Sequence, residues 1–195
     1  MNSLLDFIVI PKGKITTSIK NVNNKNIILN TELQNHNYVN RIGVVIAEPL
    51  INNTNIKKGD EIIVHHNVFR RFYDIRGKEK NSRSYLEENK YLVNQQQIFA
   101  VKKEQWECLK GFCFVKPLKE DKMFSMDFEK PGIGIVKYTD GSIEKNALVG
   151  YKLGFEYDFY IDKEKLYRVP TNQITIKYEY QGDEEEYNPS WAKSS

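Results

Sequence analysis

The residue types that bind metals or act as nucleophiles are few in this sequence. Two adjacent histidines, His65 and His66, follow a strand-like run, and the two cysteines, Cys108 and Cys113, are separated by four residues. Adjacent residues on a strand point to opposite faces, so the two histidines are not expected to bind one metal ion. No second Cys/His pair completes a tetrahedral zinc site. We therefore predict structural, buried or half-buried thiols and no metal site.

No segment has the spacing of a catalytic motif. The stretch Gly132-Ile133-Gly134 lacks the Lys-Ser/Thr pair and the following helix of a phosphate-binding loop, so we interpret it as a turn that enters a strand. No Ser/His/Asp or Cys/His pattern has a recognisable local context, and the carboxylates are scattered along the chain. The sequence therefore predicts a protein that is not an enzyme and uses no cofactor.

The apolar triplet Ile27-Ile28-Leu29 is a candidate for binding chemistry. It lies late in a polar, Asn-rich stretch that begins at Gly13. Each of the three side chains can recover roughly 1.5–3 kcal/mol on full burial, and the cost of ordering a disordered loop offsets part of that gain. The residues alone leave two interpretations open, a binding anchor on a loop or a buried edge strand.

A second candidate is the stretch from Phe69 to Glu88, which mixes aromatic and charged side chains. Within it, Arg70–Lys78 interleaves basic and aromatic residues, a pattern that can bind single-stranded nucleic acid. The alternative is a solvated loop whose aromatic side chains pack on their own domain or on a neighbouring subunit. We favour this alternative, with Phe69, Phe72 and Tyr73 as an oligomer interface, and do not expect nucleic acid as a partner. The net charge of +3 is weak for a dedicated nucleic-acid binder.

Composition places the chain among soluble globular proteins, with 40% hydrophobic and 28% charged residues. No apolar run approaches the roughly 20 residues that span a bilayer, and no secretory signal is visible, because Asp6 directly follows Leu4-Leu5. Two cysteines do not make a disulfide framework. These features predict a cytoplasmic protein with no membrane partner. The frequent Asn, Lys and Ile residues suggest an AT-rich genome such as that of a virus, which would place the protein in a host cytoplasm.

The elements that must position these residues are predicted to be strands. Helix-period patterns are scarce, and the best short candidate is Glu104–Lys110. Many short, evenly spaced strands predict an all-β barrel or sandwich. A boundary near 104–111 separates a predicted domain 1–104 from a second domain 111–182, which a solvated acidic and aromatic tail, 183–195, follows. The predicted strands are 5–10, 26–29, 43–47, 61–64, 90–93, 98–102, 112–115, 133–138, 155–161, 165–169 and 174–180.

The order of features in the first half resembles the GroES-type co-chaperonin family. A strand ending at Pro11 leads into a long polar loop, about 13–40, that carries the apolar triplet. The strand Gly43–Ala47 follows, then the turn Lys58-Gly59-Asp60, and a closing hairpin ends on Ile98-Phe99-Ala100. The resemblance covers about 5–103 and implies a small GroES-like β-barrel with a mobile loop. The chain departs from the family pattern in its short segment 48–55, which leaves little room for a roof hairpin, and in its long segment 65–88.

The second half repeats parts of the first. Phe112–Pro117 echoes Phe7–Pro11, and Gly134-Ile135-Val136 echoes Gly43-Val44-Val45. We therefore predict two tandem GroES-like barrels, the second of them degenerate, since its loop at 119–130 lacks an Ile-Ile-Leu element.

The resemblance implies a virus-encoded co-chaperonin that assists protein folding as a lid on a GroEL-type chaperonin ring. Such a lid has no active site. Ile27, Ile28 and Leu29 would bind the ring, and a homo-oligomer, ring-shaped and seven-fold by analogy, would turn weak single contacts into avidity. Two alternatives remain open. The chain can be a virion structural protein that reuses the barrel, or a single-stranded nucleic-acid-binding barrel that uses Arg70–Arg83.

Overall fold

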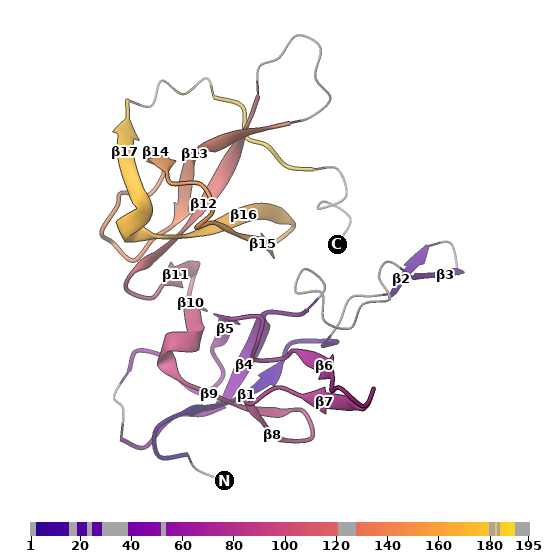
Figure 1. The fold of residues 1–195 in the computed structure, drawn as a ribbon. Coiled ribbons are helices and arrows are strands. Elements are labelled where there is room, and N and C mark those ends of the chain that lie inside the picture. The colour runs from indigo at the N-terminus through magenta and orange to yellow at the C-terminus, as the bar shows by residue number, and fades with distance from the viewer. Residues whose placement is uncertain are drawn as a thin grey trace. The chain divides into compact units, whose positions relative to one another are not determined.

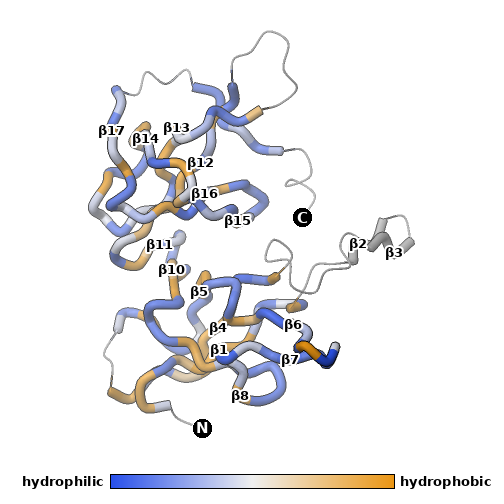
Figure 2. The backbone as a smooth tube through the Cα atoms, viewed as in Figure 1, coloured by the Kyte–Doolittle hydropathy of each residue, from blue (hydrophilic) through white to orange (hydrophobic). Residues whose placement is uncertain are grey.

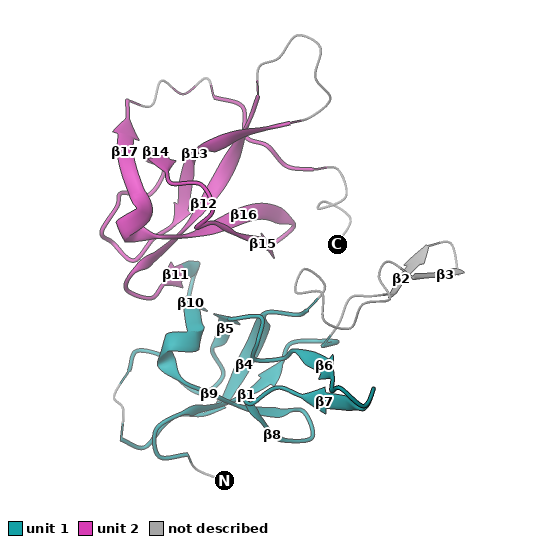
Figure 3. Ribbon diagram, viewed as in Figure 1, with its two compact units in different colours: residues 1–106 teal, residues 107–195 magenta. Residues whose placement is uncertain are grey.

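The computed structural model describes residues 3–15, 19–22, 25–28, 39–51, 54–120, 128–179, 182 and 184–189. Within this part of the chain, strands and two short 3-10 helices are the regular elements, so the predicted all-β class is confirmed (Figure 1). The described residues contain no helix long and apolar enough to cross a membrane. The chain divides into two compact units, Met1–Trp106 and Glu107–Ser195 (Figure 3).

Unit 1 is built around one seven-stranded antiparallel sheet. Its strand order is β11-β10-β5-β4-β1-β9-β8, and a 3-10 helix, Gln95–Gln97, precedes β10. Alternating apolar side chains on these strands fill a core that includes Phe7, Val45 and Val64. The strands of the sheet are β1 (Phe7–Pro11), β4 (Ile42–Ala47), β5 (Glu61–Val64), β8 (Tyr85–Glu87), β9 (Lys90–Val93), β10 (Ile98–Lys102) and β11 (Trp106–Cys108).

Two hairpins of unit 1 form separate two-stranded sheets. The first pairs β2 (Ile19–Val22) with β3 (Lys25–Ile28), and the second pairs β6 (Arg71–Tyr73) with β7 (Glu79–Asn81). Neither hairpin belongs to the seven-stranded sheet, so both are additions to the core structure of the unit.

Unit 2 contains a six-stranded antiparallel sheet in the order β15-β16-β12-β13-β14-β17. A 3-10 helix, Thr171–Gln173, precedes β17. Its core gathers Cys113, Val115, Val136, Val149 and Val169. The strands are β12 (Phe112–Lys119), β13 (Glu129–Tyr138), β14 (Leu148–Tyr151), β15 (Tyr157–Ile161), β16 (Glu164–Pro170) and β17 (Ile174–Tyr178).

The two sheets have the same strand order once β11 is set aside. The series β8-β9-β1-β4-β5-β10 of unit 1 corresponds to β15-β16-β12-β13-β14-β17 of unit 2, and in both units a 3-10 helix joins the second of these strands to the last. The register of β1 on β4 shifts between Ile8 and Val9, and that of β12 on β13 shifts between Phe114 and Val115. The bulges therefore fall at equivalent places.

Equivalent backbone hydrogen bonds extend this correspondence. The amide of Val45 donates to the carbonyl of Asp60 at 3.0 Å, and that of Val136 donates to the carbonyl of Ala147 at 3.0 Å. Directly after β5, the amide of His65 donates to the carbonyl of Gln97 at 2.9 Å. At the equivalent place after β14, the amide of Lys152 donates to the carbonyl of Gln173 at 3.0 Å.

Two connections are much longer in unit 1 than in unit 2. Residues 12–41 join β1 to β4, whereas 120–128 join β12 to β13. Residues 65–84 join β5 to β8, whereas 152–156 join β14 to β15. Because the two sheets are otherwise equivalent, the β2–β3 and β6–β7 hairpins are insertions that the sheet itself does not require.

The helix predicted at Glu104–Lys110 is wrong. Trp106–Cys108 forms β11 and a turn follows it. Trp106 is 3% exposed and the next residue is exposed, so the burial pattern has the two-residue period of a strand rather than the helical period.

Candidate functional site

The apolar triplet lies on the β2–β3 hairpin. Ile27 and Ile28 belong to β3, where they pair with Lys20 and Ile19 of β2, and Leu29 lies outside the described residues. The hairpin is carried on the connection between β1 and β4 and forms its own two-stranded sheet (Figure 1). Of the predicted mobile loop, the structure describes only residues 13–15, 19–22, 25–28 and 39–40.

Asn40 closes the base of this connection. Its Nδ2 donates to the carbonyls of Lys12 at 2.7 Å and Lys14 at 3.1 Å, and its Oδ1 accepts the amide of Ile42 at 2.9 Å. Its own amide donates to Ile15 at 2.8 Å. One side chain therefore holds the outgoing and returning strands together, so that the residues between them leave the sheet from a fixed base.

The β6–β7 hairpin carries the predicted oligomer interface, and one residue of that prediction requires correction. Phe69 is fully buried in the core of unit 1, where its ring lies edge-on to Tyr91 at 4.9 Å between ring centroids. It cannot contact a neighbouring subunit because its surface is already covered. Phe72 is half-buried, and Tyr73 is 49% exposed.

The most exposed apolar side chain of the hairpin was not among the residues predicted from the sequence. Ile75, at the turn between β6 and β7, is fully exposed at 104%. Asp74 fixes this turn, since its Oδ1 accepts the amides of Arg76 and Lys78, each at 2.9 Å. Figure 2 shows the turn as a short hydrophobic stretch next to strongly hydrophilic residues. A single aliphatic residue among charged ones forms no hydrophobic pattern, so the sequence did not predict that Ile75 is exposed.

A second apolar surface of unit 1 also lacked a sequence signal. Leu4, Leu5, Leu50 and Ile51 are between 57% and 65% exposed. The two segments that carry them lie side by side, because the amides of Leu50 and Ile51 donate to the carbonyls of Ser3 and Leu4, each at 3.0 Å. These four aliphatic side chains therefore form an exposed apolar cluster.

The two histidines do not obey the alternation assumed from the sequence. His65 and His66 follow β5 rather than continuing it, and their ring centroids lie 4.2 Å apart. Nδ1 of His65 accepts the amide of Asn67 at 3.1 Å, so this nitrogen is already engaged. Among the described residues no group of three or more His, Cys, Asp or Glu side chains is placed to hold a metal ion.

Both cysteines are free thiols in low-dielectric surroundings. Cys113 is fully buried and Cys108 is half-buried. Burial raises the pKa of Cys113 to about 12, with the Asp140 carboxylate adding to the effect. Burial also raises the pKa of Cys108 well above its usual value. Since the thiolate is the reactive form, neither residue is suited to nucleophilic chemistry.

Gly132 and Gly134 serve the backbone rather than a phosphate. Both lie inside β13, which already begins at Glu129, so the predicted turn that enters a strand is wrong; Gly132 has a positive φ of 69° within the strand. Gly134 lies opposite Pro117, and a β-carbon there would lie 2.4 Å from the Lys116 carbonyl oxygen. The close approach of β12 explains this glycine without a ligand.

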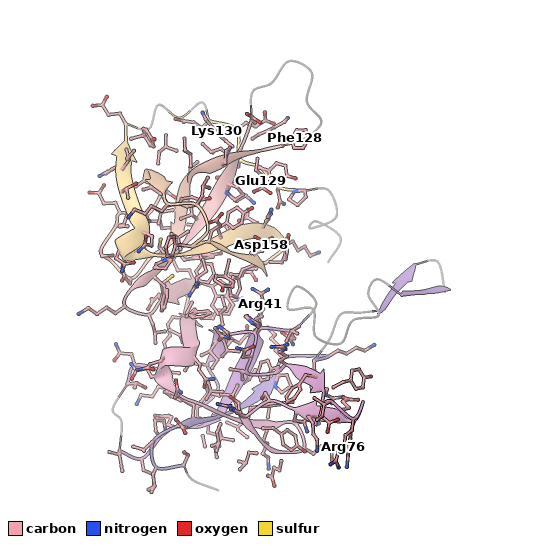
Figure 4. All side chains as sticks on the ribbon, in the orientation of Figure 1. Arg41, Arg76, Phe128, Glu129, Lys130 and Asp158 are labelled. Atoms are coloured by element: carbon pink, nitrogen blue, oxygen red, sulfur yellow. The ribbon has the colours of Figure 1, made fainter. Side chains whose placement is uncertain are left out.

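The main polar cluster of unit 2 joins the start of β13 to β16. Glu129 forms an ion pair with Lys165, which is 9% exposed, and accepts a hydrogen bond of 2.5 Å from the hydroxyl of Tyr167 (Figure 4). Burial, then this hydrogen bond, raise the pKa of Tyr167. Because these groups satisfy one another, we interpret the cluster as structural support.

The sequence predicted a solvated acidic tail. The described part of this tail instead contacts unit 2. Glu186 bridges to Leu118, and the amide of Tyr187 donates to the carbonyl of Pro117 at 2.8 Å. Ion pairs join Glu185 to Lys119 and Glu186 to Lys137, at 3.2 and 2.7 Å. The described part of the tail therefore extends the sheet of unit 2.

These features define an all-β protein of two units with the same strand order, the first of which carries two inserted hairpins. The sequence matches no protein-family model, and no curated protein matches it.

Proposed function

We propose that the chain is a GroES-type co-chaperonin-like subunit that forms an oligomeric lid and binds a chaperonin ring through Ile27, Ile28 and Leu29. The observation that carries the proposal is the separation of the β2–β3 hairpin from the seven-stranded sheet. A core strand would pair with that sheet. A hairpin that leaves it from a clamped base suits a docking element, because its backbone is already paired before binding.

The order of the elements supports the same proposal. The hairpin lies between the first two long strands of unit 1, where the resemblance places the mobile loop. Unit 2 has the same strand order with a shorter connection at this position. We interpret it as a second GroES-like copy, degenerate in its docking element. One binding hairpin per chain gives a weak single contact, and several chains in one lid give avidity.

Co-elution with a chaperonin tests the proposal. The purified protein is mixed with a double-ring bacterial chaperonin, with and without adenine nucleotide, and the mixture is separated by gel filtration. Nucleotide-dependent co-elution is the expected result. If the protein elutes alone with several chaperonins, including that of its natural host, the lid function is wrong. Stoichiometric amounts of the chain in purified virions would then identify it as a structural protein.

A further inference from the structure

The β6–β7 hairpin is the second insertion in unit 1, and nothing in the lid function described above uses it. The sheet of unit 2 forms without an equivalent, since residues 152–156 join β14 to β15 directly. The hairpin is nevertheless well anchored. Phe69 and Val68 at its base are fully buried, and the Ser82 hydroxyl donates to the carbonyl of Val68 at 2.6 Å. An arm that is anchored at its base and that the fold does not require points to an external contact.

The arm presents positive charge around an apolar tip. Between Arg70 and Arg83 the chain has six Lys and Arg residues against two Asp and Glu residues. Arg71 pairs with Glu79 at 3.0 Å. Four other cations of the arm form no ion pair with any residue that the structure describes, namely Arg76, Lys78, Lys80 and Arg83. Arg76 is next to the fully exposed Ile75 (Figure 4).

The charge and the apolar tip of the arm indicate which kind of partner it can bind. Uncompensated cations fit an anionic surface. A fully exposed aliphatic side chain fits an apolar site on a protein, whereas single-stranded nucleic acid offers bases that stack on aromatic rings. The tip of the arm is Ile75 rather than an aromatic residue. The observations therefore favour an acidic protein surface that also exposes apolar groups.

Unit 2 has a surface of this chemistry. Unit 1 holds sixteen Lys and Arg against ten Asp and Glu, a net charge of +6, and unit 2 holds thirteen against sixteen, a net charge of −3. In the segment 153–158, Leu153, Phe155 and Tyr157 are 60%, 47% and 43% exposed. Glu156 and Asp158 alternate with them in the sequence, and both are half-buried rather than fully exposed. The segment enters β15, which lies at the edge of the six-stranded sheet and pairs with β16 among the strands that the structure describes.

We propose that the β6–β7 hairpin docks on segment 153–158 of a second copy of this chain, with Ile75 among the exposed apolar side chains and Arg76 and Lys78 facing Glu156 and Asp158. Because the two surfaces differ, the contact is head-to-tail and propagates from copy to copy, which is the type of contact that builds a ring when the rotation between copies closes. The proposal supplies the lateral contacts of the proposed lid. It is tested without a chaperonin, so that either can fail alone.

Charge reversal in both partners gives the sharpest test. One variant carries Arg76→Glu and Lys78→Glu, and the other carries Glu156→Lys and Asp158→Lys. Sedimentation equilibrium measures the mass of each variant alone, of their equimolar mixture, and of the wild type at low and at roughly 0.5 M salt, where screening is strong. Circular dichroism verifies that each variant is folded.

We expect the wild type to associate at low salt and to dissociate in part at high salt. Each variant alone should be monomeric, because its reversed surface meets one of like charge. The mixture should associate again, since each reversed arm then meets a reversed segment. Ile75→Asp should weaken association at least tenfold, and the matched variant Ile51→Asp, also at an exposed aliphatic position of unit 1, should leave it unchanged.

Three results would overturn the proposal. The first is a wild type that stays monomeric up to about 100 μM, a concentration at which contacts weaker than roughly −5.5 kcal/mol go undetected. The second is association that neither double variant reduces, or that Ile51→Asp rather than Ile75→Asp abolishes. The third is binding of a fluorescent single-stranded oligonucleotide that Arg76→Glu with Lys78→Glu removes while self-association is unaffected.

Discussion

Gly59 and Asn146 hold the same position in the two units. Both have a positive φ, 95° and 65°, and each amide donates a hydrogen bond of 2.8 Å, to the carbonyls of Val45 and Val136. The turn therefore needs a left-handed residue in both sheets. Unit 1 meets the need with glycine, and unit 2 meets it with asparagine, the side chain that tolerates this region best.

The first prediction follows from this turn. Asn146→Val should destabilise unit 2 by about 1–2 kcal/mol, because a β-branched residue strongly disfavours the left-handed region. Asn146→Gly should change the stability by less than about 0.5 kcal/mol. Urea denaturation measures both, and Lys145→Val at the exposed neighbouring position is the matched control. Equal losses for Asn146→Val and Lys145→Val would show that the backbone conformation is not the cause.

Gly134→Ala should destabilise unit 2 by about 1–3 kcal/mol through overpacking. The new β-carbon would lie 2.4 Å from the Lys116 carbonyl oxygen, a backbone atom that the β12–β13 register holds in place. Hydrogen exchange of the β12–β13 amides measures the loss within unit 2, and the amides of unit 1 serve as an internal reference. Gly150→Ala is the matched control and should cost less, since its backbone has no positive φ and its β-carbon would lie no closer than 3.2 Å to side-chain atoms of Tyr178 and Ile176. Unchanged protection in Gly134→Ala would contradict the predicted close approach.

The thiol of Cys113 should make the stability of unit 2 depend on alkaline pH. Its pKa is about 12 in the folded protein, raised from an ordinary value of 9.0 mainly by burial. The unfolded thiol ionises near pH 9, so the stabilisation is complete below that pH and is lost as pH rises toward 12. Urea midpoints at pH 7.5 and 10 measure the loss. Cys113→Ala should be less stable at pH 7.5 but show a smaller decrease, and an equal decrease would exclude Cys113 as the source.

The tail should contribute through Asn188. Its Oδ1 accepts the amide of Lys165 at 3.0 Å and its Nδ2 donates to the carbonyl of Lys163 at 3.2 Å, which braces the turn between β15 and β16. Asn188→Ala should cost about 1–3 kcal/mol, the sum of two ordinary hydrogen bonds. Thermal unfolding followed by far-ultraviolet circular dichroism measures the effect. Asn172→Ala is the control, because within the described residues its side chain accepts one hydrogen bond, from the adjacent Gln173 at 3.3 Å.

Sequence patterns located the strands that bury apolar side chains, although β12 and β13 each extend four residues beyond the predicted ranges 112–115 and 133–138. Ile42–Ala47 and Glu61–Val64 lie within a residue of their predicted bounds. The short strands β6, β7 and β8 fell in a stretch assigned as irregular. Their burial patterns contain no buried residue, so no hydrophobic periodicity marks them.

The candidate site was predictable in part for the same reason. The apolar triplet is visible because three hydrophobic residues stand in a polar stretch. Phe69 was assigned to a surface because its neighbours in sequence are basic, yet tertiary packing on Tyr91 buries it. The docking of Glu185 and Glu186 on Lys119 and Lys137 was invisible, because partners so far apart in sequence meet only in the folded sheet.

The last prediction concerns the proposed binding hairpin. Ile28→Asp should abolish nucleotide-dependent co-elution with the chaperonin, because each Ile buried at the ring is worth roughly 1.5–3 kcal/mol and the loss recurs in every subunit of the lid. The fold should survive, since among the described strands β3 pairs with β2 and not with the seven-stranded sheet. Ile176→Asp is the matched control, an isoleucine that is 49% exposed on β17. Loss of folding in Ile28→Asp would mark β3 as a buried strand, and retained binding in a folded Ile28→Asp would exclude this hairpin as the anchor.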